Sequence, residues 1–210
     1  MNDEHILEMT GITKAFPGTL ALDNVLLRVK KGSVHAVIGE NGAGKSTLMK
    51  ILLGLYRADG GSIRFKGEAM DFKNPNDALS KGIAMIHQEL ANVPERNVAQ
   101  NIFLGKELTY GVTPILNERE MCRRTGELLA RLNIAIDPRA RMKDLTVSQQ
   151  QLCEIAKAVS YNADLIIMDE PTSSIMEDDV DHLFDIIRDL RANGITIIYI
   201  SHKMDELFRI

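Results

Sequence analysis

Residues 39–47 read Gly-Glu-Asn-Gly-Ala-Gly-Lys-Ser-Thr, which fits the pattern G-x-x-x-x-G-K-[ST]. The apolar run Val34–Ile38 leads into this stretch and predicts a buried strand, while Leu48–Leu53 follows it and predicts a helix. The alternative is a glycine-rich turn that fits by chance, and it does not account for the strand before and the helix after. The stretch therefore predicts a phosphate-binding loop and a chain that binds a nucleoside triphosphate.

The chemistry of such a loop accounts for the residue types found here. Glycines let the backbone curl so that successive N–H groups converge on an anion, and the following helix N-terminus adds partial positive charge. Lys45 can reach the β- and γ-phosphates, and the hydroxyl of Ser46 can ligate Mg²⁺. The predicted nucleotide-binding residues of the loop are Gly39, Glu40, Asn41, Gly42, Ala43, Gly44, Lys45, Ser46 and Thr47.

The composition limits the class of protein. With 210 residues, of which 45% are hydrophobic, the chain can bury a core and fits one domain that has room for an inserted subdomain. A net charge of −4, without a basic stripe, argues against a general nucleic-acid binder. The two cysteines share no metal-ligand spacing, which favours a reducing cytosol. The apolar runs are too short to span a bilayer, and the polar start at Met1–Glu4 is not a signal peptide.

The order of strand and helix patterns predicts the fold class. Strands are expected at His5–Met9, Leu20–Val29, Val34–Ile38, Ser62–Lys66, Ile83–His87, Leu165–Met168 and Thr196–Ile200. The last three and Val34–Ile38 are continuous apolar runs, which are typical of parallel strands covered on both faces. In between, helices are expected at Asn117–Leu132, with an Asn cap, and at Val147–Val159. We therefore expect an α/β fold with a helical insertion.

Two carboxylates close one of the apolar strands. Leu165–Met168 runs directly into Asp169 and Glu170. Asp169 can hold Mg²⁺ beside the loop, and Glu170 can take a proton from an attacking water. Strand alternation predicts that the two side chains point in different directions. The alternative is a solvated acidic strand end that opens a turn at Pro171.

Two further strand ends carry polar side chains. Gln88 closes the expected strand Ile83–His87, where its amide can contact Mg²⁺ or the attacking water. His202 follows Thr196–Ile200, where its imidazole can donate to the γ-phosphate. Each also has an ordinary interpretation, as a surface amide and as a strand-end cap, and neither residue alone decides between the two.

The order of these features along the chain resembles that of the ATP-binding cassette (ABC) ATPases. The resemblance covers essentially the whole chain and implies a P-loop NTPase (RecA-like) core, an antiparallel β subdomain and an inserted helical subdomain. It implies ATP and Mg²⁺, an adenine stacked on Phe16, and a signature segment that serves a second cassette. The residues that match the family motifs are Lys45, Gln88, Glu170 and His202 for catalysis, Ser46, Gln88 and Asp169 for the metal, and Leu145, Thr146, Val147, Ser148 and Gln149 for the signature.

A narrower resemblance points to the ATPases of bacterial monosaccharide importers, the group that serves ribose, xylose, arabinose and galactose, with the galactose/methyl galactoside type nearest. The stretches that carry it are Val34–Ile38, Ala84–Leu90, Ile136–Arg141, Glu154–Ala158, Met168–Ser174 and Tyr199–Met204. It implies ATP hydrolysis that energises sugar import, with an integral membrane permease subunit as partner and a sugar-binding protein as an indirect one. It also implies a cytoplasmic protein, peripheral on the inner face of the membrane, with no nucleic-acid partner.

The chain departs from the family pattern at the signature, which usually reads L-S-G-G-Q. Val147 and Ser148 replace the two glycines, and their side chains should hinder a close approach to the γ-phosphate. The family's usual Asp in the turn after Glu170 falls on Met176. We therefore expect a partner cassette that is unlike this one. Importer ATPases of this group carry two unlike cassettes on one chain, and this chain is similar to the first.

The same resemblance predicts one ABC ATPase domain over residues 1–210, truncated at its C-terminus. Residues 1–88 and 161–210 would form the core with its β subdomain, and 89–160 the helical subdomain, in which Glu89–Asn101 docks on the membrane subunit. Two other functions stay open. A soluble ABC-type ATPase acting on ribosomes or DNA is disfavoured because the chain lacks a coiled coil or basic arm. An ATP-binding module with little hydrolysis is consistent with the altered signature. The sequence does not name the sugar.

Overall fold

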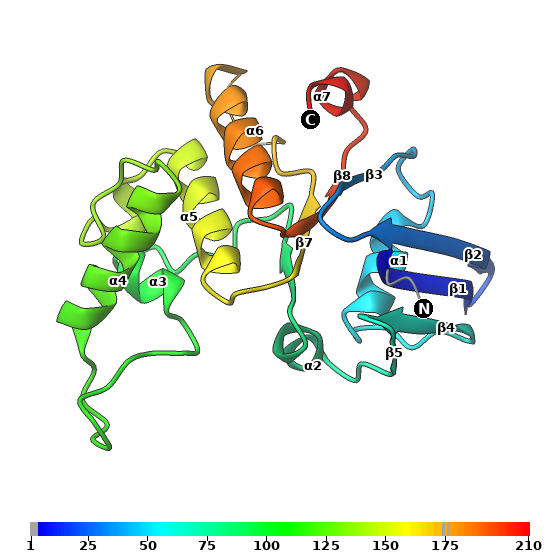
Figure 1. Ribbon diagram of the computed structural model, residues 1–210, viewed down its shortest axis with the longest axis horizontal. Coiled ribbons are helices and arrows are strands. Elements are labelled where there is room, and N and C mark those ends of the chain that lie inside the picture. Colours follow the sequence, from blue (N-terminus) through cyan, green and yellow to red (C-terminus); the bar gives the residue numbers. More distant parts are fainter. Residues whose placement is uncertain (1–3, 174, 176) are drawn as a thin grey trace. The chain divides into compact units, whose positions relative to one another are not determined.

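The computed structural model describes residues 4–173, 175 and 177–210, and the chain divides into two compact units. The first unit comprises the chain up to Met85, together with Ala163–Glu170 and Ile187–Ile210. The second comprises Ile86–Asn162 and Pro171–Ile186 (Figure 1). The expected departure at Met176 lies outside the described residues.

The first unit contains a four-stranded antiparallel sheet with the strand order β2-β1-β4-β5. Its strands are β1 (His5–Phe16), β2 (Thr19–Lys30), β4 (Gly60–Phe65) and β5 (Glu68–Met70). We expected β1 to end at Met9, but it continues to Phe16, which pairs with Thr19 across the closing turn. The apolar pattern fades before that turn because the ends of both strands are exposed. The short strand β5 was not predicted.

A parallel sheet in the order β3-β8-β7-β6 forms the rest of the core. Its strands are β3 (Val34–Val37), β6 (Ile83–Ile86), β7 (Leu165–Asp169) and β8 (Thr196–Ile200). β8 is buried throughout and β7 as far as Met168, as the apolar runs predicted. For β3 the prediction of two covered faces was wrong. It is the outer strand of the described sheet and only half-buried, and Ile38 beyond it is 53% exposed, because an apolar run does not distinguish an outer strand from a central one.

The phosphate-loop helix joins the two sheets of the first unit. This helix, α1 (Lys45–Leu52), buries Leu48, Met49 and Leu52 in a core that also contains Phe65 of the antiparallel sheet and Ile198 of the parallel one. The shorter helices α2 (Pro75–Ser80) and α7 (Met204–Arg209) complete the unit. Burial of these side chains therefore fixes α1 against both sheets.

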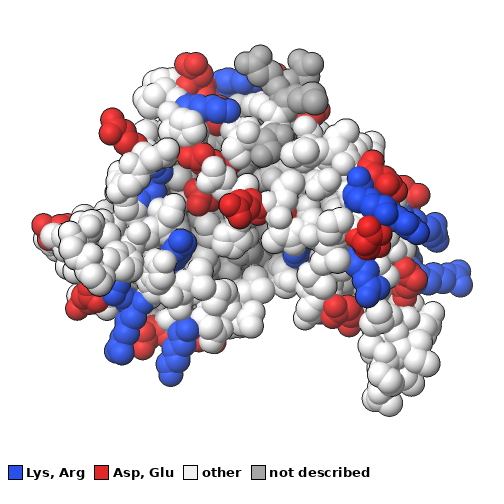
Figure 2. Space-filling view, turned by 180° about the vertical axis from the view of Figure 1, so that it is seen from behind, with Lys and Arg blue, Asp and Glu red and all other residues white. Residues whose placement is uncertain are grey.

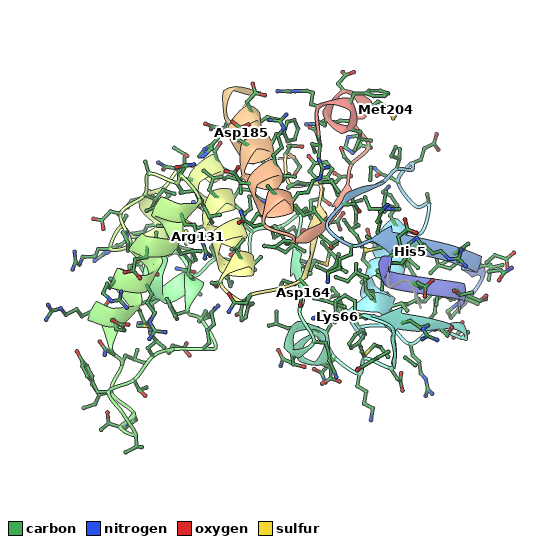
Figure 3. The ribbon with its side chains drawn as sticks, viewed as in Figure 1. His5, Lys66, Arg131, Asp164, Asp185 and Met204 are labelled. Carbon is green, nitrogen blue, oxygen red and sulfur yellow. The ribbon has the colours of Figure 1, made fainter. Side chains whose placement is uncertain are left out.

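An ion pair also ties the two sheets of this unit. Lys66, in the turn after β4, donates to the carboxylate of Asp164, which precedes β7 (Figure 3). The backbone N–H of Asp164 in turn donates to the Gly82 carbonyl at 2.8 Å. These contacts hold the antiparallel sheet, with its β1–β2 turn, in a set position on the parallel sheet.

The second unit is helical. It contains α3 (Val98–Ile102), α4 (Glu118–Arg131), the 3₁₀ helix η1 (Met142–Asp144), α5 (Val147–Val159) and the first part of α6 (Glu177–Ala192). The expected helices at Asn117–Leu132 and Val147–Val159 are confirmed, and the side chain of Asn117 caps α4 by accepting from Glu120 N–H. The helix α3 was not predicted, because five residues are too few to show a helical period.

An uncharged loop projects from the second unit between α3 and α4. A bridge between Thr109 and Leu116 closes it, and Val112 at its tip is fully exposed. In Figure 2 the loop is the white projection at the lower right, next to charged side chains of both signs. Cys153 lies in the core of α5, where burial raises the pKa of its thiol to about 12, so it is an unreactive core thiol.

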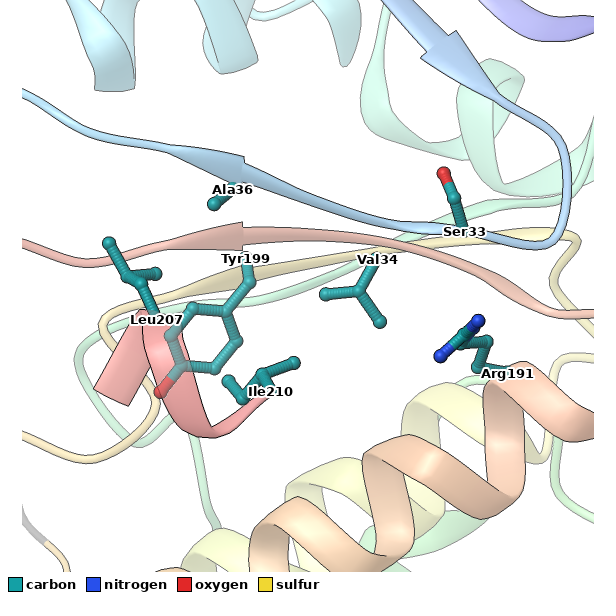
Figure 4. Close-up of a pocket in the computed structure, with 7 residues that line it drawn as sticks. All are labelled: Ser33, Val34, Ala36, Arg191, Tyr199, Leu207 and Ile210. Carbon is teal, nitrogen blue, oxygen red and sulfur yellow. The ribbon is translucent and has the colours of Figure 1, made fainter. Parts of the chain in front are cut away.

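A pocket of about 260 Å³ lies along β3 in the first unit (Figure 4). Its lining includes Val34 and Ala36 of β3, Tyr199 of β8 and Leu207 and Ile210 of the C-terminal helix region. The pocket therefore lies between one face of the sheet and the C-terminal helix region, and none of the predicted site residues lines it. No helix in the described part of the chain has both the length and the apolar character needed to cross a membrane.

Candidate nucleotide-binding site

Predicted site residues of the first unit lie at the carboxyl ends of three neighbouring strands. β3 leads into the loop at residues 39–47, β8 leads to His202, and β7 ends at Asp169. The register pairs Val37 with Ile200, and Ile200 with Asp169, so the three residues lie level with one another. Neighbouring strands lie about 4.8 Å apart, so Val37, two residues before the loop, is about 10 Å from Asp169. A triphosphate held in the loop is therefore within reach of side chains at all three strand ends.

The loop packs closely against the strand that follows Phe16. Gly44, the residue before α1, has a φ of 88°. A Cβ added there would lie 2.7 Å from the carbonyl oxygen of Ala21 and 2.8 Å from Cδ2 of Leu22. Only glycine fits at this position. Residues with a side chain rarely adopt this φ, and a Cβ would collide with β2. The glycine that the motif requires thus fixes the loop against β2.

The lysine of the loop is held by the loop's own backbone. Nζ of Lys45 donates to the carbonyl oxygens of Gly39, at 2.5 Å, and Glu40, at 3.0 Å. The side chain therefore lies along the curled backbone, with its ammonium group inside the loop. Ser46, next in the helix, is exposed, so its hydroxyl is accessible to a bound ion.

Glu170 and His202 are in direct contact. Oε1 of Glu170 lies 2.9 Å from Nδ1 of His202, and Glu170 N–H donates to the carbonyl of Ile200 at 2.9 Å. Glu170 has a φ of 47°, so it lies outside the strand and its direction is set by a left-handed turn. This turn, and not the alternation of β7, therefore sets the direction of the Glu170 side chain, and the expected difference in direction from Asp169 stays a prediction. A left-handed non-glycine residue costs about 1–2 kcal/mol, and such strain is concentrated at functional sites.

A buried carboxylate orders the segment that carries His202. The Glu206 side chain accepts from the hydroxyl of Tyr199 at 3.0 Å and from that of Ser201 at 3.1 Å, and it pairs with Lys203 at 3.1 Å. Glu206 is only 6% exposed, so its carboxylate has lost most of its contact with water. The three donors replace that lost hydration. Glu206 was not predicted, because an acidic residue in an expected helix gives no local sign that it is buried.

Phe16 lies at the turn between β1 and β2 and is 36% exposed. Since β2 continues to Ala21 and Leu22, which contact Gly44, the turn and the phosphate loop belong to one continuous surface. The ring of Tyr56 lies beside the ring of Phe16, with the two ring centroids 5.4 Å apart and the ring planes at 72°. Tyr56 was also missed, because it is 40 positions away from Phe16 and only the fold brings the two together.

The predicted metal ligands of the first unit fit Mg²⁺. Among the described residues, no group of three or more His, Cys, Asp or Glu side chains forms a metal cluster. Mg²⁺ does not need one, because it is usually bound by one or two protein oxygens, water and the phosphates of the substrate. The hydroxyl of Ser46 and the carboxylate of Asp169 are such oxygens. Gln88 belongs to the second unit and lies two residues beyond the end of β6, so it does not close that strand as expected.

The predicted signature segment forms the start of α5 in the second unit. Oγ1 of Thr146 accepts from Gln149 N–H at 3.2 Å, and Oε1 of Gln149 accepts from Thr146 N–H at 3.0 Å. This reciprocal arrangement is a capping box. Val147 is 48% exposed and Ser148 is 5% exposed. Leu145 lies just before the cap, and its carbonyl accepts from the Gln150 side chain at 3.1 Å.

Comparison with known proteins identifies the family. Residues 22–173 match the ABC transporter family. The chain belongs to the ABC transporter family of ATP-binding proteins. A nucleotide-free ATP-binding cassette from an ABC transporter has the same fold, with a TM-score of 0.86, 30% identity and coverage of 97% of this chain and 84% of the other. The ADP conformation of the cassette MJ1267 gives a TM-score of 0.86 and 31% identity, covering 98% and 85% of the two chains. The P-loop NTPase fold is thereby confirmed, and family membership implies nucleotide binding.

Curated relatives resemble the chain over its whole length. It is 54% identical over 98% of its length to the galactose/methyl galactoside import ATP-binding protein MglA 1 of Photobacterium profundum. It is 55% identical, over its full length, to a putative ribose/galactose/methyl galactoside import ATP-binding protein of Geobacillus kaustophilus. It is 53% identical over 99% of its length to MglA of Escherichia coli (strain K12). The chain spans 41%, 42% and 40% of these relatives, respectively. The narrower resemblance to sugar-import ATP-binding proteins is confirmed.

Proposed function

We propose that this chain hydrolyses ATP to energise the import of a monosaccharide through an ABC transporter. The observation that carries the proposal is the contact between Glu170 and His202 at 2.9 Å, at strand ends next to the phosphate loop. The relatives' names point to galactose, methyl galactoside and ribose as the sugars to test. The soluble ribosome- or DNA-directed alternative has no comparable support.

The residues of the first unit suggest how the reaction proceeds. The loop N–H groups and Lys45 bind the triphosphate, and the Phe16 ring stacks on adenine. The Glu170 carboxylate takes a proton from a water that attacks the γ-phosphorus, and the bond from that phosphorus to the β-γ bridging oxygen breaks, which releases ADP and phosphate. Mg²⁺ bound by Ser46 and Asp169 would neutralise charge on the phosphates, with Gln88 as a further proposed ligand.

His202 positions the carboxylate in this scheme. If Nδ1–H donates to Glu170, the neutral ring has only an acceptor left at Nε2. Nε2 can then donate to the γ-phosphate only when the ring is an imidazolium. As an imidazolium, His202 would orient the base Glu170 through Nδ1–H and stabilise charge on the γ-phosphate through Nε2–H.

The partner we propose for this cassette is a second, unlike cassette. The side chains of Val147 and Ser148 stand where the family has glycines, and the start of α5 is already capped by Thr146 and Gln149. Both features disfavour a close contact with a second chain's γ-phosphate. An ATP-dependent homodimer of this chain with full hydrolytic activity would contradict the proposal.

A membrane permease subunit is the other proposed partner, with a sugar-binding protein acting through it. The docking segment we propose, Glu89–Asn101, is bonded within the second unit to the stretch that precedes the signature. Met142 N–H donates to the Arg96 carbonyl at 3.0 Å, and Lys143 pairs with Glu95 at 2.9 Å. A displacement of this segment would therefore move the signature with it. We propose that the protein works on the inner face of the membrane and that residues 1–210 are one ATPase domain with a core and an inserted helical subdomain.

The substitution Glu170→Gln tests the proposed activity. In cells that express the protein with its permease and binding protein, we expect the variant to lose uptake of radiolabelled galactose, methyl galactoside or ribose. The purified variant should bind ATP and hydrolyse it at least about 100-fold more slowly, since the amide cannot take the proton. Asp205→Asn, an exposed neighbour of the same unit, is the matched control and should leave both rates unchanged. A wild type that binds ATP without hydrolysing it would overturn the proposal in favour of a binding module.

A further inference from the structure

Tyr56 forms an aromatic pair with Phe16. The ring centroids are 5.4 Å apart and the planes meet at 72°, an edge-to-face arrangement that aromatic rings prefer over a face-to-face sandwich. Phe16 is 36% exposed and Tyr56 37% exposed, so neither ring is a core side chain and both keep surface available to a ligand. An edge-to-face neighbour fixes the ring plane of Phe16 before any base arrives.

The position of Tyr56 is set by the helix that carries the phosphate loop. Leu55 N–H and Tyr56 N–H both donate to the Lys50 carbonyl, at 2.8 and 3.2 Å, which ties the chain to the last turn of α1. The first turn of α1 contains Lys45 and Ser46. Eight residues at 1.5 Å per residue make a helix about 12 Å long. One short, rigid helix therefore connects the phosphate end of the site with the ring beside Phe16.

A second connection closes the arrangement from the other side. Asp59 accepts from Ala15 N–H at 2.7 Å and from Lys14 Nζ at 2.7 Å, and these two contacts, the first more than the second, hold the pKa of its carboxyl below the ordinary value. Asp59 N–H donates to the Thr13 carbonyl at 2.8 Å. The chain just after Tyr56 is thus bonded to the residues just before Phe16.

Two ammonium groups face the two rings. Nζ of Lys14 lies 5.6 Å from the Phe16 centroid, and Nζ of Lys50 lies 5.5 Å from the Tyr56 centroid, both within the range of cation–π attraction. These contacts further limit the rotation of both rings. The four side chains form a preorganised surface next to the loop, and preorganisation raises affinity by reducing the entropy lost on binding.

We propose that Tyr56 is a positioning residue for the base of the nucleotide. It holds the Phe16 ring in the plane that stacks on adenine, and it fixes that plane relative to the phosphate loop through α1. This inference rests on the proposed function, because it takes Phe16 as the ring that binds adenine. It predicts that Tyr56 contributes to the affinity for adenine nucleotides and leaves the affinity for the phosphates alone unchanged.

The test measures dissociation constants by calorimetry for ATP, ADP and inorganic tripolyphosphate. We expect Tyr56→Leu to weaken ATP and ADP binding about two- to tenfold, with tripolyphosphate binding unchanged, because one edge-to-face pair is lost and the loop is untouched. Tyr56→Phe keeps the ring pair and should bind like the wild type. Tyr110→Leu removes an exposed aromatic residue of the second unit and is the matched control. Thermal unfolding should show that every variant is folded at the temperature of the titration, with a midpoint for Tyr56→Leu at most a few degrees lower because the ring pair is lost.

The outcomes separate this inference from the proposed function. If Phe16→Leu weakens ATP binding and Tyr56→Leu does not, Phe16 keeps its role and the inference on Tyr56 is overturned. An equal loss of ATP and tripolyphosphate affinity in Tyr56→Leu would also overturn it, since the residue would then support the loop. A wild type that binds neither ligand would overturn the proposed function, and the inference with it.

Discussion

The two helix starts that the sequence marks as functional, α1 and α5, are built in opposite ways. α1 begins at Lys45 after Gly44, with no side-chain cap in the described structure. α5 begins at Val147 and is capped reciprocally by Thr146 and Gln149. Backbone N–H groups in the first turn of a helix have no partner inside the helix. At α1 no side chain caps these donors, whereas at α5 the Thr146 side chain accepts from one of them, Gln149 N–H.

Because of this difference, the two helix starts should differ in their affinity for phosphate. An open helix start gains hydrogen bonds and dipole stabilisation when an anion arrives. A capped start gains less, because Gln149 N–H must first give up the Thr146 hydroxyl that it already contacts. The loop of the first unit is therefore suited to bind the triphosphate directly, whereas the signature of the second is suited to at most a weaker contact.

The largest effect is expected at the open helix start. Gly44→Ala places a Cβ 2.7 Å from the Ala21 carbonyl at a residue with a φ of 88°, so the loop must change shape. We expect ATP affinity to fall by more than about 100-fold, because the converging N–H groups are displaced. Calorimetric titration with ATP measures the loss. Gly194→Ala is the control, since Gly194 has a φ of 85° and nothing within 4 Å of an added Cβ. If the two variants bound ATP equally well, the packing of the loop on β2 would not matter.

A smaller effect is expected at the capped start. Thr146→Ala removes the side-chain acceptor for Gln149 N–H and should lower the free energy of unfolding by about 1 kcal/mol. Urea unfolding followed by circular dichroism measures it. Thr113→Ala, in the exposed loop before α4, is the control and should change stability by less than about 0.5 kcal/mol. An unchanged stability in Thr146→Ala would mean that the cap is not used, and the contrast between α1 and α5 would disappear.

A third effect concerns the far end of α5 and depends on pH. Nζ of Lys106 lies 3.5 Å from the Tyr161 ring centroid. It donates to the hydroxyl of Ser160, the residue that caps the C-terminal end of α5. Burial, and then repulsion from Lys157, lowers the pKa of Lys106 from 10.5 to about 8. Between these two pH values the unfolded chain binds more protons than the folded one, so stability rises with pH in this window.

The wild type should therefore gain stability relative to Lys106→Met as the pH rises from 8 to 10.5, a window set by the folded and unfolded pKa of Lys106. Urea unfolding at both ends of the window measures the difference. Lys143→Met, at an exposed ion pair with Glu95, is the control and should not reproduce it. A wild type that loses stability relative to Lys106→Met over this window would mean that the aromatic rings favour the ammonium form more than burial disfavours it.

Local signals accounted for much of the fold. The bounds of α5 and the cap of α4 at Asn117 were predicted from the sequence, since helical period and caps depend on residues within one or two turns. The loop at residues 39–47 was recognised for the same reason, because its function requires a contiguous stretch. Elements too short to show a period, such as α3 and β5, were missed. The outer position of β3 was missed because strand order is not a local property.

The sequence by itself determined that the chain holds a phosphate loop, a carboxylate pair at a strand end and an altered signature, since each is a short pattern whose chemistry follows from its residue types. Only the tertiary structure decided which residues meet. It brought Glu170 to His202, buried Glu206 against Tyr199, and set Tyr56 against Phe16. These pairs depend on the order of the parallel strands and on the packing of α1 between two sheets, and the free energy of that packing is summed over the whole core, where no short pattern records it.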